Sequence, residues 1–305
     1  MEYIDVHADD YALTTSASED ILECIRKGQL DSISILTNMS CYDAEAKRYL
    51  AECKAWKKQP LLSIHLNFME GHCQAKPEAV SHLVDKRGYF NIGWKDLLLW
   101  SYCPWKYQKI KQELKTEILA QTKRFVQYFG IEKPLRFDGH QHTQMIPIVY
   151  HALLEVIGEE NYTTEYIRVT KEPILPFLKE IGLWKTYSPV NWIKNLLLNV
   201  LAPSMEKKVS AEVTGQKKMF LWGVVLSGHM DERRVAKLLP AMKERARKRE
   251  RSLEILFHPG SSLKQEMGEE FVNEGANAFY DSEGRKEEYQ SLMNLTFKDD
   301  GTRKK

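Results

Sequence analysis

The chain has few cysteines and no long apolar run. Its five cysteines, Cys24, Cys41, Cys53, Cys73 and Cys103, are an odd number without a CxxC pair, which indicates reduced thiols in a cytosolic protein. No stretch approaches the roughly 18 apolar residues that a membrane span needs. The first residues lack the basic and apolar segments of a signal peptide. These absences predict a cytoplasmic protein without a membrane partner.

Neither sign of charge dominates the chain. The 44 lysines and arginines nearly balance the 42 aspartates and glutamates, which leaves a formal net charge of +2. This charge is too small to favour nucleic acid. The one strongly basic run, Lys243 to Arg251, lies in a helical pattern and is interpreted as a solvated helix face. Phosphate-binding and dinucleotide fingerprints are also missing, so no nucleic-acid partner is expected.

Strand-like and helix-like segments alternate along the 305 residues. The alternation predicts a mostly parallel sheet covered by helices, and the length is typical of one α/β domain. Polar residues at the carboxyl ends of several strands favour a deformed (β/α) TIM-like barrel. The predicted strands are 2–7, 32–36, 61–67, 134–138, 165–169, 219–226 and 253–257, with helical patterns at 16–27, 42–58, 106–129, 146–157 and 231–251.

Two segments interrupt this alternation. Residues 68–105 and 171–215 are too long for ordinary connections, so they are predicted to be insertions at a substrate cleft or a subunit contact. The apolar run Leu196 to Leu201 makes a homodimer contact a candidate role for the second insertion. Residues 298–305 are expected to form a solvated tail, which leaves 1–297 as the single domain.

The most informative stretch is Asp138-Gly139-His140-Gln141-His142. If it continues the preceding strand, alternation places Asp138, His140 and His142 on one face. Carboxylate and imidazole groups gathered at a strand end suit a divalent cation. A polar strand edge is the alternative interpretation.

Two earlier strands carry similar residues at their ends. Asp9 and Asp10 follow the first strand, where adjacent carboxylates repel each other unless a cation or a proton intervenes. If Asp10 binds a metal, Asp9 is free to act as a base, although a turn pair would also explain them. His65 ends another apolar strand, with Asn67 two residues on. Together these residues predict one metal site assembled from several strands.

Three further histidines are candidates for the same cleft. His258 directly follows the strand at 253–257 and precedes Pro259-Gly260. It could therefore project into the cleft as a general acid, or the segment could be a plain turn. His229 also follows a strand and is a weaker candidate. His7 ends the first strand and is expected to lie behind the ligands.

The motifs around these residues resemble those of the YdjC-like (ChbG-type) carbohydrate deacetylases. They are His7-Ala8-Asp9-Asp10-Tyr11, His65-Leu66-Asn67, Asp138-Gly139-His140-Gln141-His142 and His258-Pro259-Gly260, in matching order over about residues 1–260. The resemblance implies a deformed (β/α) barrel and a divalent-metal-dependent deacetylase acting on N-acetylated sugars such as chitooligosaccharides. It assigns Asp10, His65 and His140 as metal ligands, Asp9 as the base and His258 as the acid.

The chain departs from the family pattern at four positions. His7 stands where the family usually has Asn, Tyr11 and Ala12 stand for Phe-Gly, and Gln144 stands for a further histidine. The ligand positions are intact, so the departures concern substrate choice and the surroundings of the metal more than metal binding.

Rival functions and the identity of the metal stay open. Two histidines and one aspartate suit zinc, cobalt or nickel, whereas magnesium or manganese is compatible with the family. One rival is another metal-dependent hydrolase, such as an amidohydrolase or phosphoesterase. The other is a non-catalytic sugar-binding protein on the same fold. For the deacetylase, the prediction is one divalent metal ion, magnesium or zinc, as cofactor and a small-molecule or oligosaccharide substrate as partner.

Overall fold

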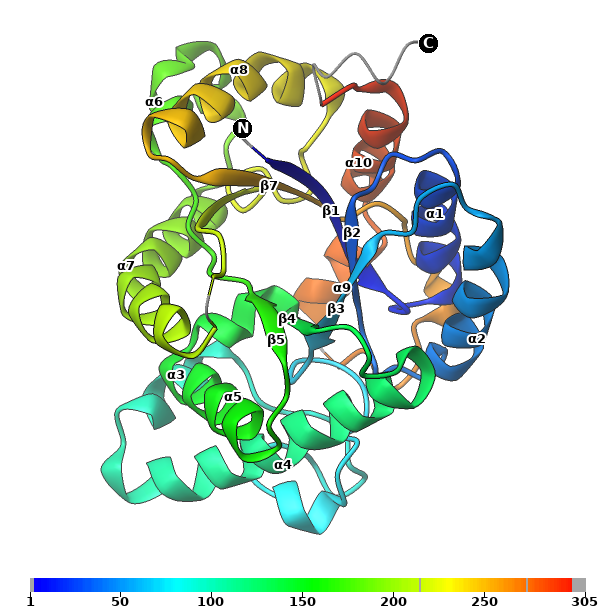
Figure 1. The fold of residues 1–305 in the computed structure, drawn as a ribbon, viewed down its shortest axis with the longest axis vertical. Coiled ribbons are helices and arrows are strands. Elements are labelled where there is room, and N and C mark those ends of the chain that lie inside the picture. The colour runs from blue at the N-terminus through cyan, green and yellow to red at the C-terminus, as the bar shows by residue number, and fades with distance from the viewer. Residues whose placement is uncertain (1–2, 214, 273, 298–305) are drawn as a thin grey trace.

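A curled sheet of seven parallel strands forms the centre of the molecule (Figure 1). The computed structural model describes residues 3–297 except 214 and 273. The strand order in the sheet is β5-β4-β3-β2-β1-β7-β6. The strands are β1 (Ile4–Tyr11), β2 (Ser32–Ile35), β3 (Leu61–Leu66), β4 (Leu135–Gly139), β5 (Thr164–Ile167), β6 (Met219–Trp222) and β7 (Ser252–Phe257). Each of the seven expected strands is therefore present, and all pairings are parallel.

The sheet does not close into the expected TIM-like barrel. β1 pairs with both β2 and β7, so the two ends of the sheet are β5 and β6. These ends approach each other through a hydrogen bond from the Leu221 N–H to the Lys171 carbonyl at 3.0 Å. β6 stops at Trp222, although the expected strand continued to 226. Gly223 follows with φ +149°, and a Cβ there would lie 2.5 Å from the Leu256 carbonyl oxygen. The strand ends here because the backbone at Gly223 turns and passes close to the backbone of β7.

Helices cover the outside of the sheet. The five expected helices correspond to α1, α2, α4, α5 and α8, and α2 is shorter than expected because a 3₁₀ turn at Cys53–Ala55 follows it. Thr14 and Asp231 cap α1 and α8 by accepting the N–H groups of Ala17 and Arg234. The helices are α1 (Thr15–Arg26), α2 (Tyr42–Glu52), α3 (Trp94–Ser101), α4 (Pro104–Phe129), α5 (Pro147–Glu159), α6 (Leu175–Lys179), α7 (Pro189–Glu212), α8 (Glu232–Lys248), α9 (Glu274–Tyr280) and α10 (Glu283–Asn294).

Of the two expected insertions, 171–215 is largely helical, whereas 68–105 consists mostly of turns and loops. Residues 68–105 contain α3, and residues 171–215 contain α6 and α7. Within the run expected to contact a second subunit, Leu196 and Val200 are 49% and 75% exposed whereas Leu198 is buried. α7 therefore has apolar side chains on two faces. The expected tail at 298–305 lies outside the described residues.

The inside of the curled sheet is polar. Alternation along β1 turns Ile4, Val6 and Ala8 one way and the acidic and imidazole side chains the other way. His7 hydrogen-bonds the Ser32 and Ser34 hydroxyls at 2.6 and 2.7 Å, both from the neighbouring strand β2. The strands therefore carry buried polar groups toward their carboxyl ends, where the site lies.

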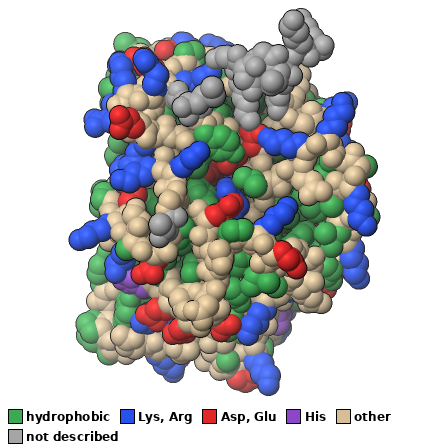
Figure 2. All heavy atoms as spheres, in the orientation of Figure 1, with side chains coloured by type: hydrophobic (Ala, Val, Ile, Leu, Met, Phe, Trp, Pro, Cys, Tyr) green, Lys and Arg blue, Asp and Glu red, His purple; other side chains and the backbone are tan. Residues whose placement is uncertain are grey.

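The surface carries charges of both signs. Figure 2 shows basic and acidic side chains interspersed over the visible face. In the part of the chain that the structure describes, no helix has the length and apolar character to cross a bilayer. All five cysteines are free thiols, as expected.

Candidate active site

The end of β1 directs two adjacent carboxylates to different partners. Asp9 and Asp10 lie within the strand, rather than after it as expected. The ladder to β2 shifts register between Ala8 and Tyr11, and Asp10 has a φ of +72°. This irregular backbone is a strained arrangement that is typical of functional sites. Asp10 faces a pair of histidines, and Asp9 faces the cation of Arg168.

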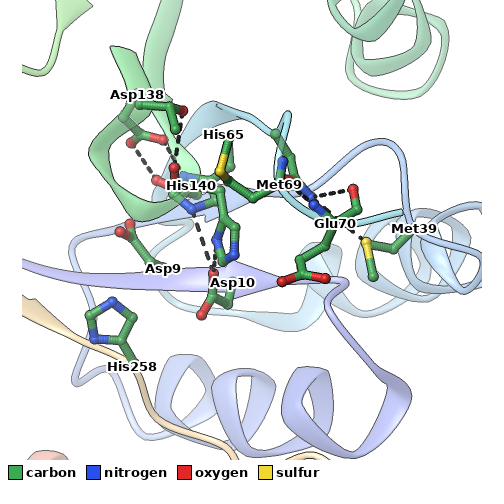
Figure 3. A network of polar contacts seen from close by, with 12 residues as sticks. Asp9, Asp10, Met39, His65, Met69, Glu70, Asp138, His140 and His258 are labelled. Carbon is green, nitrogen blue, oxygen red and sulfur yellow. Dashed lines mark hydrogen bonds and ion pairs between the residues drawn. The ribbon is translucent and has the colours of Figure 1, made fainter. Parts of the chain in front are cut away.

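Three buried side chains form a candidate metal site. The Asp10 Oδ1 atom lies 3.0 Å from His140 Nδ1 and 3.5 Å from His65 Nε2. One ligand atom from each of the three residues falls within 4.8 Å of the others. Figure 3 shows the two imidazoles and the Asp10 carboxylate turned toward one another. One carboxylate and two imidazoles are a donor set that suits a borderline divalent cation.

A second cluster of possible ligands already contains a cation. His7, Asp9 and Asp138 also bring ligand atoms within 4.8 Å. The fully buried Arg168 donates to both oxygens of Asp9 at 3.0 and 2.9 Å and lies 3.2 Å from Asp138 Oδ2. Because the guanidinium compensates these carboxylates, the second cluster does not need a metal ion. The two clusters therefore differ in what balances their charge.

Charged neighbours determine the protonation of the site. Burial alone would raise the pKa values of Asp9 and Asp10, but Arg168 and His65 hold the pKa of Asp9 well below its usual value. His140 and Arg285 do the same for the pKa of Asp10. Burial would lower the pKa of His65, yet Asp9 and Asp138 raise it to about 10. Both carboxylates are thus ionised and available as acceptors.

The expected alternation at residues 138–142 is wrong. β4 ends at Gly139, and Gln141 and His142 have φ values of +52° and +61° within a 3₁₀ segment, His140–Met145. Asp138 therefore points into the sheet interior, where its Oδ1 lies 2.6 Å from His65 Nδ1 and orients that imidazole. His142 lies 3.3 Å from the Thr170 hydroxyl. Burial, with Lys194 and Arg168 adding to it, lowers the pKa of His142 well below its usual value.

A cavity of about 340 Å³ brings the candidates together at the carboxyl end of the sheet. His258 contributes to its wall together with Asp9 and Asp10. His229 is exposed and does not line this cavity, so its expected place in the cleft is not supported. The lining residues that carry chemistry are Asp9, Asp10, His65, His140, His142, Lys194, His258 and Tyr280.

Asn67 and His7 support the site from behind. The side-chain Oδ1 of Asn67 accepts the N–H groups of Met69 and Glu70 at 2.8 and 3.1 Å, so Asn67 shapes a turn, and it does not line the cavity. His7 lies 3.0 Å from Asp9 Oδ1. At the departure from the family pattern, the buried Gln144 amide donates to the Arg168 carbonyl at 3.3 Å.

Sequence reasoning missed Arg168, which follows β5, and the site residues that come from the helices. Tyr280 of α9 places its hydroxyl 2.7 Å from His140 Nε2, and Arg285 of α10 donates to Asp10 Oδ2 at 2.8 Å. Lys194 comes from the inserted helix α7. Arg168 directly follows β5, and an arginine one residue after a strand is a signal that could have been noticed. The helical residues carry no comparable local signal.

Comparison with known proteins agrees with the fold and the motifs. A family model described as YdjC-like protein matches residues 3–302. A carbohydrate deacetylase from Danio rerio is 28% identical over 174 residues, which cover 56% of this chain and 51% of the relative. One from Thermoanaerobacter pseudethanolicus is 30% identical over 176 residues, 57% of this chain and 64% of the relative. The chain thus spans less than two thirds of the length of either relative.

A solved structure supports the architecture. A protein from Enterococcus faecalis V583, described as a candidate cellobiose-phosphate cleavage protein, superimposes with a TM-score of 0.56 at 14% identity. The superposition covers 97% of this chain and 92% of that chain. At this identity the likeness shows the fold alone.

Proposed function

Because the chain belongs to the YdjC-like protein family, we propose that it is a divalent-metal-dependent hydrolase that removes acetyl groups from N-acetylated sugars of the chitooligosaccharide kind. The observation that carries the proposal is the convergence of Asp10, His65 and His140 beside Asp9 and His258 in one cavity. A metal triad with a separate base and a separate acid suits the metal-assisted hydrolysis of an amide.

Asp10, His65 and His140 would hold the cation. When bound, a divalent ion supplies Lewis-acid chemistry: it polarises an acetyl carbonyl and lowers the pKa of a water molecule. The two imidazoles favour zinc, cobalt or nickel over magnesium. Asp10 Oδ1 faces the histidines while its Oδ2 accepts a hydrogen bond from Arg285, so one oxygen of the carboxylate stays directed at the proposed ion site.

Asp9 and His258 would move the protons. Asp9 lines the cavity as an ionised carboxylate that Arg168 orients through both oxygens. It would accept the proton of the attacking water. His258 would donate a proton to the sugar nitrogen as the C–N bond breaks. The products are acetate and a free amino sugar, and the two transfers balance the addition of one water.

The first experiment measures acetate release and metal content together. Protein stripped of metal is reloaded with single divalent cations and given N,N′-diacetylchitobiose. Replacing Asp10, His65 or His140 with alanine should abolish both metal binding and acetate release. Asp9→Asn should retain the metal and reduce kcat by about 10²-fold or more. His82→Ala is the matched control, since His82 pairs with Glu113 away from the cavity.

Specific outcomes would contradict the proposal. Stoichiometric metal without acetate release from any N-acetylated sugar would favour another metal-dependent hydrolase or a non-catalytic sugar-binding protein. An Asp9→Asn protein with full activity would remove Asp9 as the base. A protein that binds no divalent cation at all would overturn the proposed site.

A homodimer contact through α7 is a further part of the proposal. It is supported by Ile193, Leu196 and Val200, which are exposed at spacings that place them along one side of the helix. Light scattering of the purified protein would show a dimer, and Ile193→Lys should convert it to a monomer. A monomeric wild-type protein at micromolar concentration would refute the contact.

A further inference from the structure

Helix α10 contacts the end of one strand and the loops that follow two others. Arg285 donates through Nε to the Gly260 carbonyl at 2.5 Å and through Nη1 to Asp10 at 2.8 Å. One helical turn further, Glu288 accepts the backbone N–H groups of Gly228 and His258 at 2.7 and 2.6 Å. The helix therefore connects the end of β1 to the segments after β6 and β7.

Helix α10 packs closely against the segment that follows β6. Gly284 faces the Gly228 backbone so closely that a Cβ at 284 would lie 2.1 Å from the Gly228 carbonyl oxygen. Glu288 is fully buried, and a buried carboxylate is costly unless it is hydrogen-bonded or paired. The close packing of α10 therefore holds the Glu288 carboxylate in place relative to His258.

His258 has one ring nitrogen directed toward this carboxylate. The His258 Nδ1 atom is buried and has no hydrogen-bond partner among the described residues, and it lies 3.7 Å from Glu288 Oε2. Phe279 packs against the imidazole edge-on, with ring centroids 5.4 Å apart. A carboxylate beside one imidazole nitrogen orients the ring and leaves the other nitrogen directed at a reacting group.

We infer that Glu288 is a positioning residue for the proposed acid, because its buried carboxylate holds the backbone and the Nδ1 side of His258 so that Nε2 carries the transferable proton. This inference rests on the proposed deacetylase function. It assigns a role in proton transfer to a residue about 30 positions after the histidine. Glu288 does not itself line the cavity.

The dependence on the leaving group separates this role from a purely structural one. A sugar amine leaves only after it is protonated, whereas nitrophenolate leaves from 4-nitrophenyl acetate without a proton. Glu288→Gln should therefore lower kcat on N,N′-diacetylchitobiose by about 10- to 100-fold, with KM within about twofold. Hydrolysis of the ester should stay within about twofold of wild type, and the metal content should be unchanged.

A double-mutant cycle shows whether Glu288 acts through the histidine. In a His258→Ala background, Glu288→Gln should cause no further loss on the sugar. Glu287→Gln is the matched control, because Glu287 is the exposed neighbour on the same helix, and it should behave as wild type.

The inference would be overturned by equal losses on the sugar and the ester, since these would report a general disturbance of the site. A further loss in the His258→Ala background, or wild-type kcat in Glu288→Gln, would also overturn it. If the wild-type protein released no acetate from any N-acetylated sugar, the proposed function would fail and this inference with it.

Discussion

The two sides of the sheet are held together in different ways. From β4 through β3, β2 and β1 to β7, each strand pairs with the next by a parallel ladder, which is irregular only where β1 shifts register against β2 between Ala8 and Tyr11. Between β5 and β6 the backbone contact is the hydrogen bond from Leu221 to Lys171. We call the first region the ladder side and the gap between β5 and β6 the seam. The proposed metal ligands come from the strands of the ladder side and the segment after β4. At the seam, side-chain hydrogen bonds and ion pairs connect the strands in place of a backbone ladder.

Two buried charged residues dominate the seam. Arg168, one residue after β5, reaches Asp9 of β1, Asp138 of β4 and Glu254 of β7, the last at 2.7 Å. Glu172 accepts three successive N–H groups of residues 223–225, which follow β6, at 2.7 to 3.1 Å. The difference indicates that a curled sheet can lack a backbone ladder between its two edge strands if buried charged side chains connect them. This interpretation can be tested by removing each connection.

The largest effect is expected from Arg168→Met. The change leaves Asp9, Asp138 and Glu254 buried without their shared cation, and breaking one partner of a buried ion pair costs about 3–5 kcal/mol. Urea unfolding monitored by circular dichroism should show a loss of this size. Arg87→Met is the control, because that guanidinium pairs with Asp85 and Glu269 at the surface and should cost less than about 1 kcal/mol. Equal effects of the two changes would mean that the seam does not depend on its buried charge.

A smaller effect, which depends on pH, is expected from Glu172→Gln. Burial raises the pKa of Glu172 to about 7, even though three backbone N–H groups favour its ionised form. A raised carboxyl pKa means that the folded protein binds more protons, so the stabilisation is complete below about pH 4.5 and is lost as the pH rises to about 7. The shift corresponds to about 3 kcal/mol. Between pH 5 and 7, the free energy of unfolding should fall more steeply in wild type than in Glu172→Gln.

The control for this slope is Glu165→Gln. Glu165 lies on β5, and its side chain is 43% exposed, so its replacement should leave the pH dependence of wild type intact. If Glu172→Gln kept the same slope as wild type, the carboxylate would already be ionised in the folded protein at pH 5, and its three hydrogen bonds would outweigh its burial.

The same contrast explains what could be predicted from the sequence. The seven strands, five of the helices and the clustering of Asp10, His65 and His140 follow from local patterns and from the rule that parallel strands end at one edge. Two predictions were wrong because they extended a strand too far, through 142 after β4 and to 226 after β6. Left-handed backbone at Gln141 and His142 ends the first of these patterns, and alternation cannot reveal it.

Residues on the covering helices were not predictable by the same means. Tyr280, Arg285 and Glu288 reach the site only because α9 and α10 dock across the ends of β1 and β7. The residues around them form a charged, solvent-facing helical pattern. Nothing in their spacing indicates a contact with a residue more than 20 positions away. Tertiary packing determines their role, so a single sequence offers no local pattern that would identify it.

The smallest effect concerns the end of the ladder side, where β1 becomes irregular. Ala12 is fully buried and has a φ of +67°, a conformation that costs an L-residue roughly 1–2 kcal/mol and costs glycine almost nothing. Ala12 also occupies the position at which the first motif of the resembling family has glycine. Ala12→Gly removes this strain, and the loss of one buried methyl group and the freer unfolded chain offset part of the gain.

The matched control applies the same substitution to a regular part of the strand. Ala8 is fully buried in β1 and has no positive φ, so Ala8→Gly only loses packing and gains freedom in the unfolded state. The free energy of unfolding of Ala12→Gly should exceed that of Ala8→Gly by about 1–2 kcal/mol in urea titrations. If both substitutions destabilised the protein equally, the turn after Asp10 would hold no strain, and the irregular end of β1 would be as relaxed as the ladder that precedes it.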